Sequence, residues 1–367
     1  MKIVQLCPYD MSRPGGVQRH VRDLSRWLTA QGHETRVLCP PTPGTAPGTE
    51  GMITTLGRSR LIGAHGTEFE LSFAAPRALA AATRDLRDWG ADVVHMHTPW
   101  TPFVTSQLWS RLRLPSVATV HATLPAPNAR GLTDRFIRSA ATRILPACDR
   151  VVVPSDAPLE MLRRVLPTLE PTILPPTIDL SDWAAAAQPR RAGPLEIAFL
   201  GRLEPRKGLD VALAAWALIA KALPHARLSI AGDGPMRAQA DAARSDRVTV
   251  LGRPDDAQAR ALLGRADILL APAPYGESFG LILLEAMAAG CLPVAAANAG
   301  YASVLTGPGT ALLVPPNDPK ALADKVIAMA SPPQAVRDWA AAAADRYDVA
   351  RVGPAYLHLY EDILSAR

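Results

Sequence analysis

Short apolar runs alternate with stretches of helical periodicity along the chain, and this alternation constrains the fold more than any single motif. The runs within residues 149–155, 195–203 and 266–272 are not broken by a polar residue at every second position. Strands that are apolar on both sides are typical of parallel sheets covered by helices on both faces. Because the rhythm occurs twice, we predict an α/β protein with two doubly wound parallel sheets.

A break in this rhythm marks the predicted domain boundary. The 367 residues are enough for two domains, and residues 179–194 are rich in Ala, Pro and Arg. We therefore expect an N-terminal domain over residues 1–185 and a second domain over residues 186–348. A last helix within residues 349–367 has no strand to pair with, so we expect it to cross back to the N-terminal domain.

Composition and charge limit the classes of function. The N-terminus has too short an apolar run for a signal peptide, and no 18-residue stretch is free of charge and Pro, so we expect a soluble, cytoplasmic protein. The net charge of +5 comes without a block of basic residues, which argues against nucleic-acid binding. An anionic acceptor and a weak contact with a membrane surface both stay open.

Two glutamates mark the most informative stretch, GESFGLILLEAMAAG, which spans residues 276–290. Glu285 falls on an otherwise apolar predicted helix, where a carboxylate needs a dedicated partner. Glu277 precedes that helix, next to backbone N–H groups that lack intrahelical partners and attract phosphate or sugar oxygens. The pair follows a predicted strand, and open α/β sheets bind ligands at the carboxyl ends of their strands.

Other polar residues also follow predicted strands. Arg202 and Lys207 come after the run AFLG, where two cations would offset the charge of a diphosphate. Gly16 lies in a turn before a helix, where the backbone can approach a ligand closely. His95 and His97 are interpreted as structural histidines at a strand end.

A metal site is disfavoured by the sequence. It contains no D-x-D pair, no H-E-x-x-H and no Cys/His spacing typical of ligands, and its four cysteines lie far apart. Asp255 and Asp256 are interpreted as the start of a helix. Neither G-x-G-x-x-G nor a P-loop is present, so the sequence gives no support for dinucleotide redox chemistry or ATP hydrolysis.

Six motifs in order carry a family resemblance: PGGVQ, TVHAT, GRLEPRKG, AGDGP, LGR and ESFGLILLEAMAAG. Together they resemble the retaining GT-B glycosyltransferases of family 4 over essentially the whole chain. The opening CPYDMSRPGGVQ is similar to that of the bacterial mannosyltransferases that act on phosphatidylinositol. The resemblance implies two Rossmann-like domains that face a cleft, the first binding the acceptor and the second the nucleotide sugar.

The resemblance also implies roles for individual residues. Arg202 and Lys207 would bind the donor diphosphate, Glu277 a sugar hydroxyl, and Glu285 the two ribose hydroxyls. His121, at the family's TxH position, would lie near the transferred sugar. The remaining implied residues bind the donor or the acceptor: Gly16, Ser278, Phe279, Gly280 and Leu281 for the donor, and Tyr9 and Gln18 for the acceptor.

The implied reaction is transfer of a hexose, of mannose or glucose type, from a GDP- or UDP-sugar with retention at the anomeric carbon. The departing phosphate would take the acceptor proton, so neither a metal nor a cofactor beyond the nucleotide sugar is expected. The acceptor could be polyprenyl-linked, phospholipid-linked, a saccharide or a small molecule. An enzyme with a lipid acceptor could contact the inner membrane face peripherally.

Some positions depart from the closest pattern. Ala259 occupies a position that is often Lys in relatives that read guanine, which leaves GDP and UDP both open. The stretch around Arg77, Arg84 and Arg87 has no Lys cluster, which weakens the case for tight binding to an anionic membrane.

Two alternative functions remain. Another GT-B enzyme, such as a sugar-nucleotide 2-epimerase, would need acid/base carboxylates in the site that the sequence does not offer. A nucleotide-sugar-binding protein that has lost catalysis would not need to keep Glu277, Glu285, Arg202 and Lys207 together.

Overall fold

The computed structural model describes residues 1–64, 67–99, 104–122, 131–189 and 193–366. Thr123 of the TVHAT motif and residues 190–192 of the predicted boundary lie outside the described residues. Contacts divide the chain into two compact units, with Met1–Ile178 and Val349–Arg367 in unit 1 and Asp179–Asp348 in unit 2.

The division falls after Ile178, whereas the sequence suggested residue 185. The difference arises from helix α6 (Ser181–Ala186), which packs against helices α9 and α10 of unit 2. The approach is so close that a Cβ on Gly264, in α9, would lie 2.0 Å from the carbonyl oxygen of Ala186.

Unit 2 contains a parallel sheet with the strand order β13-β12-β11-β14-β15-β16. The order reverses between β11 and β14, which is the topological switch point where doubly wound sheets bind ligands. Its strands are β11 (Glu196–Leu200), β12 (Arg227–Ala231), β13 (Val248–Gly252), β14 (Ile268–Ala271), β15 (Leu292–Ala296) and β16 (Leu313–Val314).

Helices cover the sheet of unit 2. Apolar residues of α7 and α12 form one buried cluster with the strands, and α7 packs on α12. Helices α6, α9, α10 and α13 pack together as a second group. The elements are η2 (Pro205–Lys207), α7 (Leu209–Ala222), α8 (Arg237–Ala242), α9 (Asp256–Arg265), α10 (Leu281–Ala288), α11 (Ala299–Val304), η3 (Gly307–Leu312), α12 (Pro319–Ala328) and α13 (Gln334–Asp345).

Unit 1 contains a second sheet with the order β10-β9-β8-β7-β1-β2-β4-β3, parallel except for the pair β3 and β4. The predicted doubly wound parallel sheets are thus confirmed in both units. The strands are β1 (Lys2–Leu6), β2 (Glu34–Cys39), β3 (Thr49–Glu50), β4 (Ile53–Thr55), β7 (Val93–His97), β8 (Ser116–Thr119), β9 (Arg150–Val153) and β10 (Thr172–Ile173), beside a separate hairpin of β5 (Arg58–Ala64) and β6 (Thr67–Phe73).

Two sets of helices cover the faces of this sheet. Residues of β1 alternate between them: Val4 and Leu6 pack with the set that contains α2, α3, α4 and α5, and Ile3 packs with α1 and α14. The helices are α1 (Gly16–Ala30), α2 (Pro76–Asp88), α3 (Val104–Leu112), α4 (Leu132–Ile144), η1 (Leu145–Ala147), α5 (Asp156–Val165) and α14 (Val349–Ser365).

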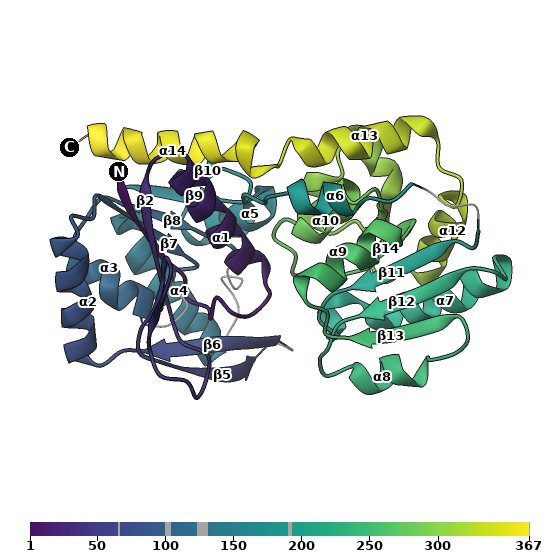
Figure 1. Cartoon of the computed structure of the whole chain (residues 1–367), viewed down its shortest axis with the longest axis horizontal. Helices are drawn as coiled ribbons and strands as arrows, with labels where there is room; N and C mark the ends of the chain where they lie inside the picture. The colour runs from purple at the N-terminus through teal and green to yellow at the C-terminus, as the bar shows by residue number, and fades with distance from the viewer. Residues whose placement is uncertain (65–66, 100–103, 123–130, 190–192, 367) are drawn as a thin grey trace. The chain divides into compact units, whose positions relative to one another are not determined.

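Helix α14 belongs to unit 1 although it follows unit 2 in the chain, and it lies alongside α1 (Figure 1). The contact is tight because a Cβ on Gly353 would lie 2.7 Å from the indole of Trp27. The backbone N–H of Val349 donates to the carbonyl of Ile178 at 2.8 Å, where the chain returns to unit 1.

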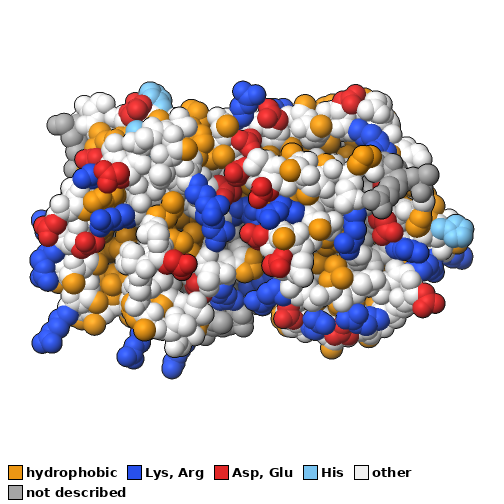
Figure 2. All heavy atoms as spheres, in the orientation of Figure 1, with side chains coloured by type: hydrophobic (Ala, Val, Ile, Leu, Met, Phe, Trp, Pro, Cys, Tyr) orange, Lys and Arg blue, Asp and Glu red, His pale blue; other side chains and the backbone are white. Residues whose placement is uncertain are grey.

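No helix among the described residues is both long enough and apolar enough to cross a bilayer. On the face of unit 2 that Figure 2 shows, basic and acidic side chains are interspersed.

Histidines are the unusual component of unit 1's interior. His20 of α1 and His95 and His97 of β7 are fully buried, and His121 is partly buried just beyond β8. Burial lowers the pKa of His20 and His97 well below the ordinary value of 6.5, and neighbouring histidines lower both further. Burial likewise lowers the pKa of His95 and His121 to about 3.

These shifts predict that the protein loses stability as the pH falls below 6.5. The unfolded chain takes up protons on these histidines from about pH 6.5 downward, while burial keeps the same rings neutral in the folded chain well below that pH, so acid favours unfolding. The fully buried His20, His95 and His97 should together lower the free energy of unfolding by about 3 kcal/mol between pH 6.5 and 5.5. Urea unfolding followed by circular dichroism at these two pH values measures the change.

Exposed His225 provides the matched control. Replacing His225 with Gln should leave the pH dependence unchanged, because this residue is exposed and lies outside the buried histidine cluster. A free energy of unfolding that is equal at pH 6.5 and 5.5 would contradict the assignment of neutral buried histidines.

Candidate active site

The loops that follow β11 and β14 meet at the switch point of unit 2. Gly208, at the end of the first loop, has a left-handed backbone with φ of +72°. A Cβ there would lie 2.5 Å from the carbonyl oxygen of Pro272 in the second loop. The two loops are therefore in direct backbone contact, and glycine is required at this point.

Ion pairs connect the side chains of these loops. Lys207 Nζ donates to Glu277 Oε1 at 2.6 Å, and Arg206 Nη1 lies 3.9 Å from the same oxygen. Arg206 also pairs with Glu204, their Nε and Oε1 atoms being 2.5 Å apart. Arg202 Nη2 lies 3.4 Å from Glu204 Oε2. The structure thus brings the predicted residues Arg202, Lys207 and Glu277 into one network.

The network holds more positive than negative charge. The Glu204 side chain is 3% exposed and that of Glu277 is 12% exposed, so both carboxylates need cationic partners. Arg202, Arg206 and Lys207 supply three cations for these two carboxylates. The side chains of these cations are partly exposed, and cations so placed suit contact with a phosphate-bearing ligand.

The backbone around Glu277 is fixed by close packing on the neighbouring helix α11. A Cβ on Gly300 would lie 2.3 Å from the carbonyl oxygen of Glu277. Asn298 accepts from the backbone N–H of Tyr301 at 2.9 Å and donates to the carbonyl of Ala273 at 2.8 Å. The loop therefore holds the Glu277 carboxylate in a set position without support from a ligand.

Helix α10 begins directly after this loop. Gly280 precedes its first residue, Leu281, with φ of +115°, and a Cβ on Gly280 would lie 2.6 Å from the Tyr301 ring. Gly280 has no side chain to cap the first N–H groups of the helix, which leaves them open to an anionic or polar ligand.

The other residues predicted to bind the donor substrate lie just before α10 or within it. The Phe279 ring is buried and packs edge-on against Tyr347 at 5.3 Å, so Phe279 can face a ligand only with its backbone, whereas Ser278 is half-buried. Leu281 is half-buried, and Glu285 is 8% exposed on the otherwise apolar α10. The predicted acidic residue on an apolar helix is therefore observed.

The predicted residues of unit 1 lie after β1. Gly16 is the first residue of α1, and the Gln18 side chain folds back so that its Oε1 would be 2.3 Å from a Cβ on Gly15. Gln18 is buried, and its amide donates to the carbonyl of Asp10 at 3.3 Å. Tyr9 packs against the apolar cluster of this loop. Gln18 thus shapes the loop, a role the sequence did not suggest.

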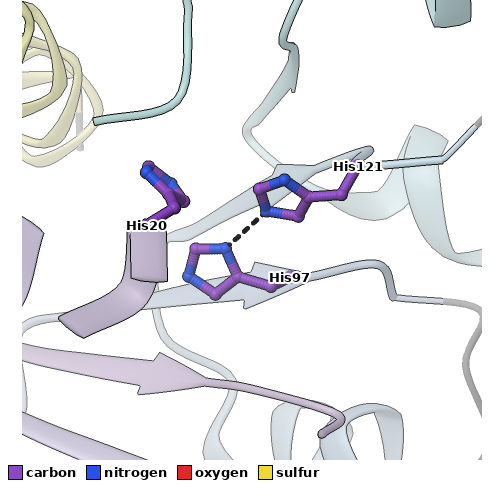
Figure 3. A group of neighbouring side chains, drawn as sticks. All are labelled: His20, His97 and His121. Atoms are coloured by element: carbon purple, nitrogen blue, oxygen red, sulfur yellow. Dashed lines mark hydrogen bonds between the residues drawn. The ribbon is translucent and has the colours of Figure 1, made fainter. Parts of the chain in front are cut away.

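His121 contacts a histidine that the sequence analysis treated as structural. His97 Nδ1 lies 2.9 Å from His121 Nε2, and the rings of both lie near His20 (Figure 3). His97 Nε2 lies 2.7 Å from Gln5 Oε1, which can only accept. His97 therefore carries its proton on Nε2, and His121 donates its own Nε2 proton to His97 Nδ1.

The spacing of the three rings alone would suit a metal ion, since one nitrogen each of His20, His97 and His121 lie within 4.8 Å of one another. The hydrogen bonds argue against it. The backbone N–H of Thr177 donates to His20 Nδ1 at 2.9 Å, so the His20 proton is on Nε2. That Nε2 has no partner among the described residues and presents a proton, whereas a metal ligand must present a lone pair.

Sequence reasoning missed several residues of both clusters. Glu204 and Arg206 lie inside GRLEPRKG, and the charge pattern of this motif was the available signal. His20 and Gln5 carried no signal, because a single polar residue on an apolar helix or strand does not reveal which distant side chain it contacts.

Comparisons with known proteins match this architecture. The chain matches the family "Glycosyltransferase Family 4" over residues 14–182 and the family "Glycosyl transferases group 1" over residues 183–346. It is 33% identical over 316 residues to a phosphatidyl-myo-inositol mannosyltransferase of Propionibacterium freudenreichii, covering 83% of this chain and 80% of the relative. The mannosyltransferase of the same name from Mycobacterium leprae is 31% identical over 380 residues, covering 100% of this chain and 98% of the relative.

A solved structure shows the same fold. The sucrose-phosphate synthase of Thermosynechococcus elongatus superimposes with a TM-score of 0.77 at 22% identity, covering 100% of both chains. The same family and fold are indicated by the order of the motifs, by the two doubly wound sheets and by relatives that span nearly the full length of the chain. The chain belongs to the family 4 glycosyltransferases and has the GT-B fold.

Proposed function

We propose that this glycosyltransferase transfers a hexose, of mannose or glucose type, from a nucleoside diphosphate sugar, with retention and without a metal ion. The observation that carries the proposal is the network at the switch point of unit 2, where Lys207 and Arg206 meet Glu277. Cations for a diphosphate and a fixed carboxylate for a sugar hydroxyl are then adjacent, as a nucleotide sugar requires.

The charge that develops on the leaving diphosphate is the main demand of this reaction. Arg202 and Lys207 would bind its oxygens, and Arg206 would add to the local positive potential. These cations supply the stabilisation that a divalent metal gives in other transferases. Lys207 can contact a phosphate oxygen and keep Glu277 in place, because an ammonium group has three donors.

Glu277 would accept hydrogen bonds from the hydroxyls of the transferred sugar, with the backbone N–H groups of Phe279 and Gly280 beside it. Glu285, on α10, would accept from both ribose hydroxyls. Gly16, at the start of α1, would give a backbone N–H to the donor. These roles use groups that the fold holds in place before a ligand binds.

The state of the carboxylates bears on how retention would be achieved. Glu204 and Glu277 are both held in ion pairs, and a covalent glycosyl intermediate needs a carboxylate that is free to attack. Attack on the same face as the departing phosphate, with that phosphate taking the acceptor proton, needs no such group. The same pairing disfavours a 2-epimerase, which requires acid and base carboxylates.

His121 would contact the transferred sugar as a neutral group. Because burial lowers the pKa of His121 to about 3, its ring carries no charge at neutral pH and acts through hydrogen bonds alone. An active transferase is favoured over an inactive binding protein because the chain keeps Arg202, Lys207 and Glu277 in one network and Glu285 on the helix that follows.

The acceptor is proposed to be lipid-linked, since relatives at 31–33% identity are named for phosphatidyl-myo-inositol. Saccharide and small-molecule acceptors are the alternatives, and Tyr9 and Gln18 mark the loop that would meet the acceptor. A lipid acceptor would bring this cytoplasmic enzyme to the inner membrane face. Ala259 is buried and offers no cation to a guanine, so both GDP and UDP sugars are candidates.

Replacing Lys207 or Glu277 with Ala should lower kcat by roughly a hundred- to a thousandfold, the usual effect of removing one charge-stabilising group. Lys221→Ala is the matched control, because Lys221 is an exposed lysine in the same unit, in α7. Steady-state transfer assays, with circular dichroism to verify folding, measure the effect. Full turnover in either site variant would reject the assignment.

Activity should be unchanged by a chelator, since cations of the protein bind the diphosphate. The assay compares transfer rates with and without EDTA after exhaustive dialysis. Loss of transfer that Mg²⁺ restores would show that the reaction depends on a metal.

The donor can be identified by thermal shift against GDP- and UDP-sugars. A nucleotide sugar at 100 times its Kd should stabilise the folded protein by roughly 2.7 kcal/mol. The matched nucleotide should raise Tm in the wild type and much less in Lys207→Ala. Equal shifts in both proteins would show that the ligand does not bind at the Lys207 network.

A further inference from the structure

A continuous series of buried hydrogen bonds runs from His121 through unit 1 to helix α14 and ends at backbone carbonyls. Its members come from β1, β7, β8, α14 and the loop after β10, and all but His121 and the partly buried residues 174 and 175 are almost fully buried. Water is therefore excluded from the interior of the series, and each group must find its partner within the protein.

The direction of donation is set at the far end. The Tyr356 hydroxyl donates to the carbonyl oxygens of Pro175 and Leu174, at 3.2 and 3.4 Å. A carbonyl can only accept, so the single Tyr356 proton is used there. The hydrogen bond between Tyr356 and Thr119 must then be donated by the Thr119 hydroxyl.

The donor and the acceptor of each of the next hydrogen bonds follow in the same way. Since the Thr119 proton is used, His95 Nε2, 2.7 Å from Thr119 Oγ1, must be the donor. His95 Nδ1 is then an acceptor, and it receives the proton of Tyr360, whose hydroxyl lies 2.7 Å away. The oxygen of Tyr360 accepts in turn from the Gln5 amide nitrogen at 3.4 Å.

Gln5 fixes the direction of hydrogen-bond donation at His97 and, through it, at His121. With its nitrogen turned to Tyr360, its Oε1 faces His97 Nε2 at 2.7 Å and accepts the His97 proton. His97 Nδ1 is left as an acceptor for the Nε2 proton of His121 at 2.9 Å. Every link donates in one direction, from His121 toward the carbonyls of residues 174 and 175.

We propose that Tyr360, Gln5 and His97 are positioning residues that hold His121 as its Nε2–H tautomer, with the Nδ1 lone pair left to accept a hydrogen bond. His121 then recognises a group that donates, such as a hexose hydroxyl, and does not suit an acceptor oxygen such as that of a phosphate. The substrate contact rests on the proposed function, whereas the tautomer is a property of unit 1 alone.

Tyr360→Phe is the sharpest variant because it removes one oxygen atom from the middle of the series. Without that oxygen the Gln5 amide loses the partner that orients it and can turn its nitrogen toward His97. His97 would then carry its proton on Nδ1, and His121 would have to carry its own on Nδ1. Ile363→Val is the matched control: it removes one methylene from the same buried cluster of α14 and takes no hydrogen-bonding group from the series.

The tautomer can be measured directly by NMR of the full chain labelled with ¹⁵N histidine at pH 7.5, with His121→Gln to assign the signal. We expect the wild type and Ile363→Val to show His121 protonated on Nε2. Tyr360→Phe should show a mixture of His121 tautomers and a roughly three- to tenfold lower kcat, the usual effect of one weakened hydrogen bond. Its Tm should fall below that of Ile363→Val, because His95 Nδ1 and the Gln5 amide lose a buried hydrogen-bond partner.

Two results would overturn the inference: a wild-type His121 protonated on Nδ1, or a Tyr360→Phe variant whose His121 signals equal those of the wild type. The wild-type spectrum decides the tautomer even if a variant folds poorly. Should the protein prove to transfer no sugar, the spectra would still test the series. Should transfer occur with unchanged His121 signals in Tyr360→Phe, the proposed function would stand and the positioning role would fall.

Discussion

The ion pair between Lys207 and Glu277 is the interaction on which the candidate site depends. It joins the loops after β11 and β14, which are distant in sequence and adjacent only because the strand order reverses there. The pairing of a nearly buried carboxylate with two cations avoids the cost of an isolated buried charge. It also sets the position of both groups before a ligand arrives, so binding requires little rearrangement of the protein.

The buried hydrogen-bond series of unit 1 consists of neutral groups, whereas the candidate site of unit 2 contains charged ones. The series from His121 to Tyr356 consists of histidines, tyrosines, a threonine and an amide that hydrogen-bond one another, so that the series itself buries no charge. Charged side chains suit the donor side, where a diphosphate must be neutralised, and neutral rings suit a sugar, which needs hydrogen bonds alone. The buried series of unit 1 and the candidate site of unit 2 thus differ in their electrostatics.

The sequence predicted the fold, and it placed the charged residues after their strands, because both features leave local traces; the roles of these residues stay predictions. Apolar runs indicated the strands, and the motifs around Arg202, Lys207 and Glu277 stand directly after them. The short strands β3 to β6 were missed, since two to seven residues with mixed polarity carry little periodicity. The series from His121 to Tyr360 could not be foreseen, because its links join residues up to 355 positions apart. Only the packed structure shows that such residues share one interior.

The packing of helix α14 in unit 1 affects the order in which the two units can fold during synthesis. Its buried residues, among them Val352 and Tyr356, cover a face of the sheet formed by the first residues of the chain, including Ile3. During synthesis, the whole of unit 2 emerges from the ribosome before that face can be covered. Unit 2 can therefore complete its core first, while unit 1 exposes apolar surface, a state that favours aggregation and chaperone binding. The unit that begins with the first residues synthesised is therefore the last to complete its core.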